Sequence, residues 1–389
     1  MKQYGKHLIT DADIIAVNKA LKSEYLTQGN EVPNFEKNIK SITKSKYAVA
    51  SNSATSSLHL ACLALEVGQS DIVWVPAITF VASANCARYC GAKVDFVDIN
   101  LDDFLISSDA LEKKLIRAKN NHCLPKVLIV VHLAGKSCDM KTLWDLSRKY
   151  NFKIIEDASH AIGAFYEQEP VGCCRYSEIS VFSFHPVKII TSGEGGIATT
   201  NSKILAERMQ LLRTHGITKD SNKLVNIPMK DLPHYYEQQD LGFNYRMSDI
   251  HAALGNSQLQ RLTKIVNRRN EIANLYINYL KGQSKITFQK NHNIDTLSSW
   301  HLFIVRFTEI KNVIEKRKII ENLSGLGIGT SFHYLPLFYH PYYKTNNFPY
   351  DEYPNSLEYF NTSLTIPLYP ELENYEIEFI AKSIIGEIR

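Results

Sequence analysis

The sequence lacks the features that define several classes of protein. Lys and Arg number 44 and Asp and Glu 40, so the 389-residue chain has a net charge of only +4, without the basic excess of an electrostatic nucleic-acid binder. No apolar run reaches the roughly 18 residues of a membrane span, and the N-terminus has no signal-peptide core. These absences predict a cytoplasmic protein that binds neither nucleic acid nor membranes.

Cysteine spacing excludes the common zinc and redox motifs. The seven cysteines include no CxxC pair, so neither a zinc ribbon nor a thioredoxin-like site is predicted, and we expect no metal site. Cys86 and Cys90 lie four positions apart on a predicted helix, which favours burial on one helix face. Cys173 and Cys174 are adjacent, and we expect them to be structural, although no specific role follows for the pair.

Short apolar runs alternate with helical segments in the first part of the chain. This alternation is typical of βαβ units and predicts an α/β fold around a mostly parallel sheet. The predicted strands are 47–51, 72–75, 94–97, 127–131 and 153–155, and the predicted helices are 56–65, 80–89, 111–118 and 143–150.

The pattern changes after about residue 176. Strands predicted at 179–184 and 197–200 are joined by a loop too short for a helical crossover, so we expect them to pair antiparallel. Residues 219–239 are polar and predict a long exposed loop. A single long helix is expected at 250–279, as a linker between domains.

We therefore predict two domains. Residues 1–249 would form the large α/β domain with an N-terminal arm, and residues 250–389 the linker helix and a smaller α+β domain. The elements expected in the second domain are a strand at 301–307 and helices at 313–323 and 375–385.

Two strand ends in the parallel region carry candidate ligand-binding groups. Residues 51–56 (SNSATS) join a strand to a helix, where small side chains and free N–H groups favour an anion. No GxGxxG or Walker motif is present. Asp157 closes another strand and can pair with a cation such as a pyridinium nitrogen. Taken singly, both features also fit ordinary helix capping.

A lysine and a glycine-rich turn follow. Lys188 lies in a bend after Pro186, and a lysine in a confined pocket can lose its proton and attack an aldehyde. A solvated surface charge is the plain alternative. Residues 191–196 (TSGEGG) hold three glycines, which permit close backbone approach. An anion cradle, a strand-end Asp and a reactive Lys together are what pyridoxal 5′-phosphate requires.

Six segments resemble, in order, the DegT/DnrJ/StrS family of sugar aminotransferases. The resemblance runs from near the N-terminus to about Pro367 and implies the fold-type-I architecture of pyridoxal phosphate enzymes, as in aspartate aminotransferase, with a large mixed but mostly parallel sheet. The segments are SNSATSSLHL, PAITFVASAN, EDASHAIGA, SFHPVKIITSGEGG, RTHGI and LGFNYRMSDIHAALG.

The resemblance also implies roles for individual residues. Lys188 would bind the cofactor and shuttle protons, Asp157 would pair with the ring nitrogen, and His160 would approach the 3-hydroxyl. Phe80 would pack on the ring, with a core role as the alternative. The phosphate would be held by Ala54, Thr55, Ser183 and, from the neighbouring subunit, Asn244. The substrate site would contain His185, Glu194, His215, His333 and Tyr334.

The HPVK motif and FHYLPLFYHPYY most resemble the subgroup that makes 4-amino sugars for pseudaminic acid. This implies amino transfer from L-glutamate to C4 of a UDP-linked 4-keto-6-deoxy-N-acetyl hexose, by a homodimer with shared active sites. Three alternatives stay open. The acceptor could be UDP-4-keto-arabinose or a dTDP-linked keto sugar. The protein could be a sugar dehydratase, which Lys188 argues against, or a non-catalytic sensor or scaffold.

Overall fold

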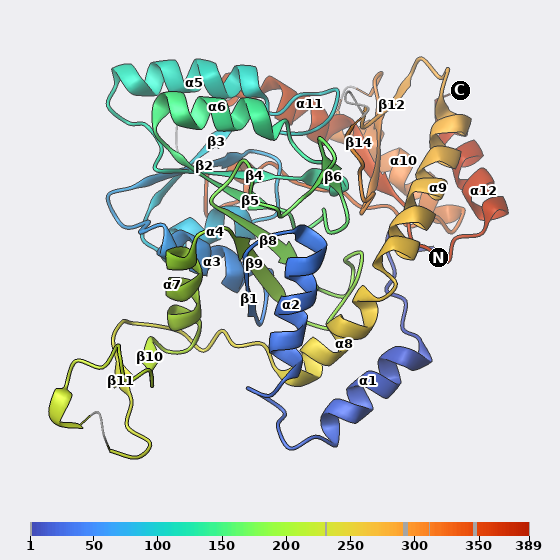
Figure 1. The fold of residues 1–389 in the computed structure, drawn as a ribbon. Coiled ribbons are helices and arrows are strands. Elements are labelled where there is room, and N and C mark those ends of the chain that lie inside the picture. The colour runs from blue at the N-terminus through green and yellow to red at the C-terminus, as the bar shows by residue number, and fades with distance from the viewer. Residues whose placement is uncertain (1, 230–231, 291–294, 311, 345–347, 389) are drawn as a thin grey trace.

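The computed structural model describes residues 2–229, 232–290, 295–310, 312–344 and 348–388. Within these residues, the centre is a seven-stranded sheet of order β1-β9-β8-β5-β4-β2-β3 (Figure 1). Strands β2, β3, β4, β5 and β8 run parallel, and β9 is antiparallel to both β8 and β1. The predicted α/β class and the antiparallel pair are thus confirmed. The bounds are β1 Tyr47–Ser51, β2 Ile72–Pro76, β3 Lys93–Val97, β4 Val127–Val131, β5 Lys153–Asp157, β8 Ile179–Ser183 and β9 Gly196–Thr200.

Helices cover both faces of this sheet. One face packs against α3, α4 and α7, and the other against α5 and α6. Strand residues alternate between the two faces, so Ile155 of β5 joins the first core and Ile154 the second. The same alternation sends the two acidic residues that end β5 in opposite directions. The helices are α3 Ala54–Ala64, α4 Ala82–Tyr89, α5 Ser108–Asn120, α6 Met140–Tyr150 and α7 Lys203–Arg213.

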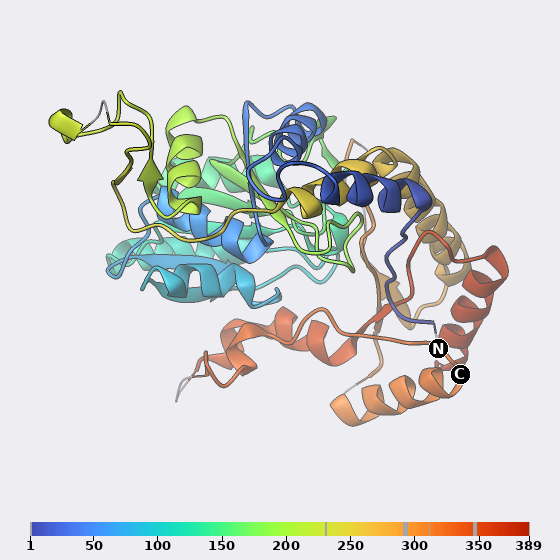
Figure 2. The ribbon, with the colours of Figure 1, turned by 90° about the horizontal axis from the view of Figure 1, so that it is seen from below.

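A second, three-stranded antiparallel sheet lies in the C-terminal part of the described chain, in the order β12-β13-β14. Its core includes buried residues of α9, α10 and α12. The N-terminal segment joins this region through a bridge between Lys2 and Ile328, and Figure 2 shows both chain ends beside it. The bounds are β12 Ile286–Phe288, β13 Phe303–Phe307, β14 Ser363–Ile366, α9 Leu262–Leu280, α10 Val313–Gly325 and α12 Asn374–Gly386.

The single helix predicted at 250–279 is wrong. The structure has two helices, α8 (Asp249–Leu259) and α9, with a turn at Gln260 and Arg261. The guanidinium of Arg261 binds the buried carboxylate of Asp13 at 2.7 Å, which fixes the turn against α1 (Asp11–Leu21). A contact across some 250 positions of chain therefore overrides the local helical pattern.

The segment predicted as an exposed loop at 219–239 projects from the body of the molecule in Figure 1. Its described part includes β11 (Glu237–Gln238), which pairs with β10 (Ile217–Thr218), and a short 3₁₀ helix at Ile227–Met229. The Glu237 carboxylate accepts the N–H groups of Val225 and Asn226, both at 2.8 Å, and so holds the hairpin together.

The remaining elements are α2, which packs into the core through Phe35 and Ile39, and several short segments. Among the described helices, none combines the length and apolarity needed to cross a lipid bilayer. The division into two domains at residue 250 stays a prediction. The other elements are α2 Glu31–Thr43, α11 Pro354–Thr362, β6 Phe165–Tyr166, β7 Glu169–Pro170, and the 3₁₀ turns Leu133–Gly135, Leu337–Tyr339 and Tyr350–Glu352.

Candidate active site

A cavity of about 280 Å³ lies where β1, β5 and β8 end. Ligands of open α/β sheets bind at the carboxyl ends of strands, and nearly all the residues singled out from the sequence meet here. The predicted residues that line the cavity are Ala54, Thr55, Phe80, Asp157, His160, Ser183, His185, Lys188, Glu194, His333 and Tyr334.

One wall of the cavity is the N-terminus of α3. Ser53 caps this helix by accepting the N–H of Ser56 at 3.1 Å, which leaves the first N–H groups of the helix available to an anion. The backbone of β9 approaches closely at Gly196, where a Cβ atom would stand 2.4 Å from the backbone nitrogen of Ala54. Only glycine leaves room for this cradle, and Ser183 completes it at the end of β8.

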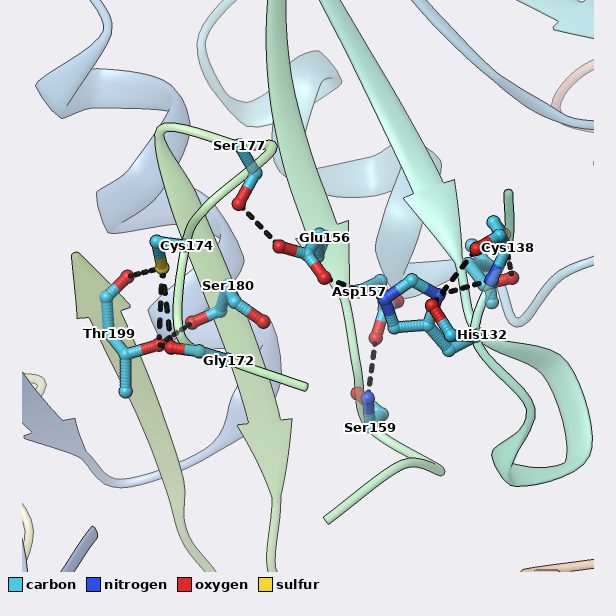
Figure 3. Close-up of polar contacts among 12 residues, drawn as sticks. His132, Cys138, Glu156, Asp157, Ser159, Gly172, Cys174, Ser177, Ser180 and Thr199 are labelled. Atoms are coloured by element: carbon cyan, nitrogen blue, oxygen red, sulfur yellow. Dashed lines mark hydrogen bonds and ion pairs between the residues drawn. The ribbon is translucent and has the colours of Figure 1, made fainter. Parts of the chain in front are cut away.

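Asp157 ends β5 and its carboxylate is buried in the cavity wall. Ser83 of α4 donates a hydrogen bond of 2.6 Å to Oδ2. The backbone N–H of Ser159 donates one of 3.1 Å to Oδ1 (Figure 3). Thr79 in turn lies 2.8 Å from the Ser83 hydroxyl. These contacts fix the orientation of the carboxylate, which can then pair with a protonated ring nitrogen.

Lys188 follows β8 and lies half-buried in the same cavity. Burial lowers the pKa of its amine to about 8, although the charge of Asp157 acts in the opposite direction. About a tenth of the amine is therefore neutral at pH 7, far more than for an ordinary lysine. A neutral amine in a confined site is the form that attacks an aldehyde.

His160 lines the same cavity as Lys188. The Ala134 N–H donates to its Nδ1 at 3.3 Å, and its Nε2 lies 3.2 Å from the Tyr334 hydroxyl. Burial, with the charges of Lys188 and His333, lowers the pKa of His160 well below its usual range. The ring is therefore neutral, and its Nε2 can donate a hydrogen bond. Phe80 is half-exposed, with its ring centre 5.9 Å from that of Tyr334, so a purely core role for Phe80 does not fit.

The predicted substrate residues, and Asn244 predicted at the phosphate, divide into two groups. His185 and Glu194 are exposed at the cavity, and buried His333 bonds the Thr365 hydroxyl through Nδ1 at 2.8 Å. His215 and Asn244 do not line this cavity. His215 is exposed, and Asn244 lies in a backbone bridge with Thr214.

Three cavity-related residues escaped the sequence reasoning. Tyr4, from the N-terminal segment, lines the cavity and packs edge-on against His333 with ring centres 5.0 Å apart. His301 lies with its ring centre 4.3 Å from that of His160. Ser83 was also missed, although it lies on the helix predicted at 80–89. Nothing in the local sequence marks the other two.

Comparison with known proteins identifies the family. A profile of the DegT/DnrJ/EryC1/StrS aminotransferase family matches residues 7–385. A UDP-4-amino-4,6-dideoxy-N-acetyl-beta-L-altrosamine transaminase of Campylobacter jejuni is 37% identical, over 99% of this chain and 97% of its own length. The structure of PseC from Helicobacter pylori, an aminotransferase of pseudaminic acid biosynthesis, has a TM-score of 0.88 at 29% identity, covering 100% of this chain and 99% of that one.

The cofactor follows from the family and from the cavity. An aminotransferase from Streptococcus pneumoniae in its PLP form matches with a TM-score of 0.87 and 30% identity, over 99% of this chain and 98% of that one. The helix cradle suits the phosphate, buried Asp157 the ring nitrogen and Lys188 the aldehyde. The chain therefore belongs to the DegT/DnrJ/EryC1/StrS family, as an aminotransferase that uses pyridoxal 5′-phosphate.

Proposed function

We propose that this aminotransferase moves the amino group of L-glutamate to C4 of a UDP-linked 4-keto-6-deoxy-N-acetyl hexose, in the synthesis of a pseudaminic-type sugar for a surface glycan. The observation that carries the proposal is the meeting of Lys188, Asp157 and His160 in one cavity beside a helix N-terminus. The choice of sugar rests on the name of the Campylobacter jejuni relative and on the PseC structure.

Lys188 and Asp157 perform the central chemistry in this proposal. Pyridoxal phosphate, when bound, supplies an electron sink for the carbanion formed at the substrate carbon. Lys188 would hold the cofactor through its aldehyde, and its free amine would move a proton between the substrate carbon and C4′ of the cofactor. Asp157, held by Ser83 and Ser159, keeps the ring nitrogen protonated. A ring whose nitrogen is kept protonated by the Asp157 carboxylate accepts the electrons of the carbanion more readily.

The surrounding residues bind and orient. Ala54, Thr55 and Ser183 hold the phosphate through the cradle at α3. His160, as a neutral ring that donates from Nε2, bonds the 3-oxygen of the cofactor in place of the Tyr334 hydroxyl. Phe80 covers the ring from the half-exposed side.

The rest of the cavity serves the substrates. His185, Glu194, His333 and Tyr334 contact the sugar or the amino donor. In a homodimer, Asn244 would reach the phosphate of the second subunit's cofactor, which is consistent with its place outside the cavity of its own chain. His215, which also lies outside that cavity, would contact the sugar nucleotide. Both substrates are anionic, so local donors rather than the net charge of +4 account for their binding.

A coupled assay tests the proposal. Purified enzyme is given L-glutamate with UDP-N-acetyl-4-keto-6-deoxy-β-L-arabino-hexulose, and 2-oxoglutarate is measured. UDP-4-keto-arabinose and a dTDP-linked 4-keto-6-deoxy sugar are run as competing acceptors. We expect the highest kcat/KM with the first acceptor. A preference for either other sugar would replace the substrate and keep the reaction, whereas sugar conversion without glutamate consumption would indicate a dehydratase.

A second measurement separates an enzyme from a sensor or scaffold. The protein reconstituted with pyridoxal phosphate is expected to show a visible absorbance band that changes when L-glutamate is added. A colourless reconstituted protein, or a band that no amino donor changes, would contradict the proposed activity. Lys188→Ala serves as the matched control, because it keeps the cavity and removes the amine.

A further inference from the structure

A buried polar cluster lies directly behind the active site, on the opposite face of β5. Strand alternation points Asp157 into the cavity and Glu156 the other way. The Glu156 carboxylate lies 2.7 Å from Nε2 of His132, and the Ser177 hydroxyl donates to its other oxygen (Figure 3). Glu156 is 4% exposed and His132 is fully buried. A carboxylate so deeply buried requires partners of this kind.

The backbone fixes the tautomer of His132. The N–H of Cys138 points at Nδ1 of His132 at 3.2 Å, and a backbone N–H can only donate. Nδ1 therefore accepts, so the ring is neutral and its proton is on Nε2, which donates to Glu156. The His132 ring thus accepts from the backbone through Nδ1 and donates to the Glu156 side chain through Nε2.

The same loop reaches the active site from behind. The backbone N–H of His132 donates to the Asp157 carbonyl at 3.1 Å. Two residues further on, the N–H of Ala134 donates to Nδ1 of His160 at 3.3 Å. The loop from His132 to Cys138 thus contacts Glu156, Asp157 and His160 at successive points. Of these three contacts, the one between His132 and Glu156 is the only one that involves a side-chain carboxylate.

The contact between the Ala134 N–H and Nδ1 of His160 determines which ring nitrogen of His160 carries the proton. Because Nδ1 accepts from Ala134, the proton of the neutral ring sits on Nε2, which faces the Tyr334 hydroxyl. The titratable groups around this ring are Lys188, His301, His333 and Tyr334. Among the described contacts of this ring, the hydrogen bond to Nδ1 comes from the Ala134 N–H, so this contact directs the proton to Nε2.

We infer that His132 and Glu156 form a buried clamp that positions the loop 132–138, and that through the Ala134 N–H this clamp holds His160 as an Nε2–H donor toward the cofactor. His132 and Glu156 are positioning residues, since neither lines the cavity. The inference rests on the proposed contact between His160 and the cofactor's 3-oxygen. Loosening the clamp lets the Ala134 N–H drift, and the donor at Nε2 is lost.

The test is a pH titration of the visible absorbance band in the full-length holoenzyme. A donor to the 3-oxygen stabilises its deprotonated form, so losing that donor raises the midpoint. His132→Leu is expected to raise the midpoint by about one pH unit, in the same direction as His160→Phe. His132→Gln, whose amide can donate to Glu156 in place of Nε2, is expected to stay close to the wild type. The double variant His132→Leu/His160→Phe is expected to shift no further than His160→Phe alone.

Each outcome decides a different point. If His160→Phe shifts the midpoint and His132→Leu does not, the clamp is wrong and the proposed function stands. If neither variant shifts it, the contact of His160 with the 3-oxygen is wrong and the inference falls with it. Additive shifts in the double variant would also overturn the inference, because they would make His132 act independently of His160.

Two further variants separate positioning from stability. Leu128→Ala removes a buried side chain from β4, outside the clamp, and is expected to lower the thermal midpoint without moving the absorbance midpoint. If His132→Leu does not fold, the absorbance midpoint of Glu156→Gln tests the clamp instead. This substitution keeps the shape of the side chain and removes its carboxylate. A folded Glu156→Gln enzyme with an unshifted midpoint would overturn the inference, and a smaller shift in the same direction would support it.

Discussion

Lys188 is subject to two opposing influences on its protonation. Burial in the cavity wall favours the neutral amine, and the carboxylate of Asp157 favours the charged one. Burial dominates and the pKa falls to about 8. The amine is thus neutral often enough to react, while Asp157 stays available to the ring nitrogen.

Replacing Lys188 removes both the attachment point and the proton carrier. We expect Lys188→Ala to reduce turnover to background and to abolish the cofactor adduct that borohydride traps in the wild type. Mass spectrometry of the reduced protein and the coupled assay measure the two effects. Lys203→Ala, at an exposed position on α7, should leave both unchanged. Persistent turnover in Lys188→Ala would disprove the assignment.

The depressed pKa predicts the pH dependence of cofactor capture. The neutral amine is the reactive form, so the rate at which apoenzyme captures pyridoxal phosphate should rise with pH and level off above about pH 8. Asp157→Asn removes the charge that raises the Lys188 pKa, so the midpoint should move to lower pH while turnover falls severely. Stopped-flow absorbance across a pH series measures the midpoint. An upward shift in Asp157→Asn would contradict the described balance of charges.

The phosphate cradle depends on how closely two elements approach. A Cβ atom at Gly196 would stand 2.4 Å from the backbone of Ser53 and Ala54, so Gly196→Ala must push α3 away from β9. We expect this overpacking to destabilise the fold by about 1–3 kcal/mol and to weaken cofactor affinity at least as strongly. Gly325→Ala, at the end of α10 with no atom within 4 Å of the new Cβ, is the control. Equilibrium dialysis gives the Kd, and an unchanged value would show that the cradle does not hold the phosphate.

Element types could be predicted because the local pattern and the tertiary environment agree. The β-branched run at 127–131 is a buried strand by composition and by position. The break at Gln260 could not be predicted, because it depends on Arg261 binding Asp13. The strand-end residues Asp157 and Lys188 were found from their place in the alternation of strands and helices.

Partners that come from distant elements could not be found in the same way. The bond from Ser83 to Asp157 joins α4 to β5, and Tyr4 reaches the cavity only because the N-terminal segment pairs near Ile328. Neither fact has a local sequence signature. Conversely, His215 and Asn244 carry a strong motif resemblance but lie outside the cavity of their own chain. The motif gives no indication of this placement.

At the scale of the whole molecule, one buried cation ties the second sheet to α9. Arg269 donates to the carbonyls of Trp300, His301 and Leu368 at 3.1–3.2 Å, and burial lowers its pKa to about 10. Arg269→Met leaves these buried carbonyls without their donor, and we expect it to lower the free energy of unfolding by about 3 kcal/mol. Arg317→Met, in an exposed pair on α10, should change it by less than about 0.5 kcal/mol. Chemical denaturation measures both, and equal effects would show that the triple contact does not stabilise the fold.

The placement of Asn244 makes the number of subunits testable through activity. In its own chain, the backbone oxygen of Asn244 accepts from Asn52 at 3.4 Å, and its side chain lines no part of the cavity. The chain before Asn244 carries exposed apolar side chains, among them Val225 and Leu241. If Asn244 serves the cofactor of a partner, each site combines Lys188 of one subunit with Asn244 of the other.

Mixing two defective variants then restores activity. Lys188→Ala and Asn244→Ala homodimers have a defect in every site, but a hybrid dimer has one site with both wild-type residues. After subunit exchange, an equal mixture should show about one quarter of the wild-type activity, because half of the dimers are hybrids and half of their sites are intact. Mixing Lys188→Ala with Asp157→Ala is the control. Both residues line the cavity of the same chain, so each of the two sites in a hybrid dimer lacks one of them. That mixture should stay inactive. If the first mixture stays inactive as well although native mass spectrometry detects hybrids, Asn244 acts within its own chain or not at all.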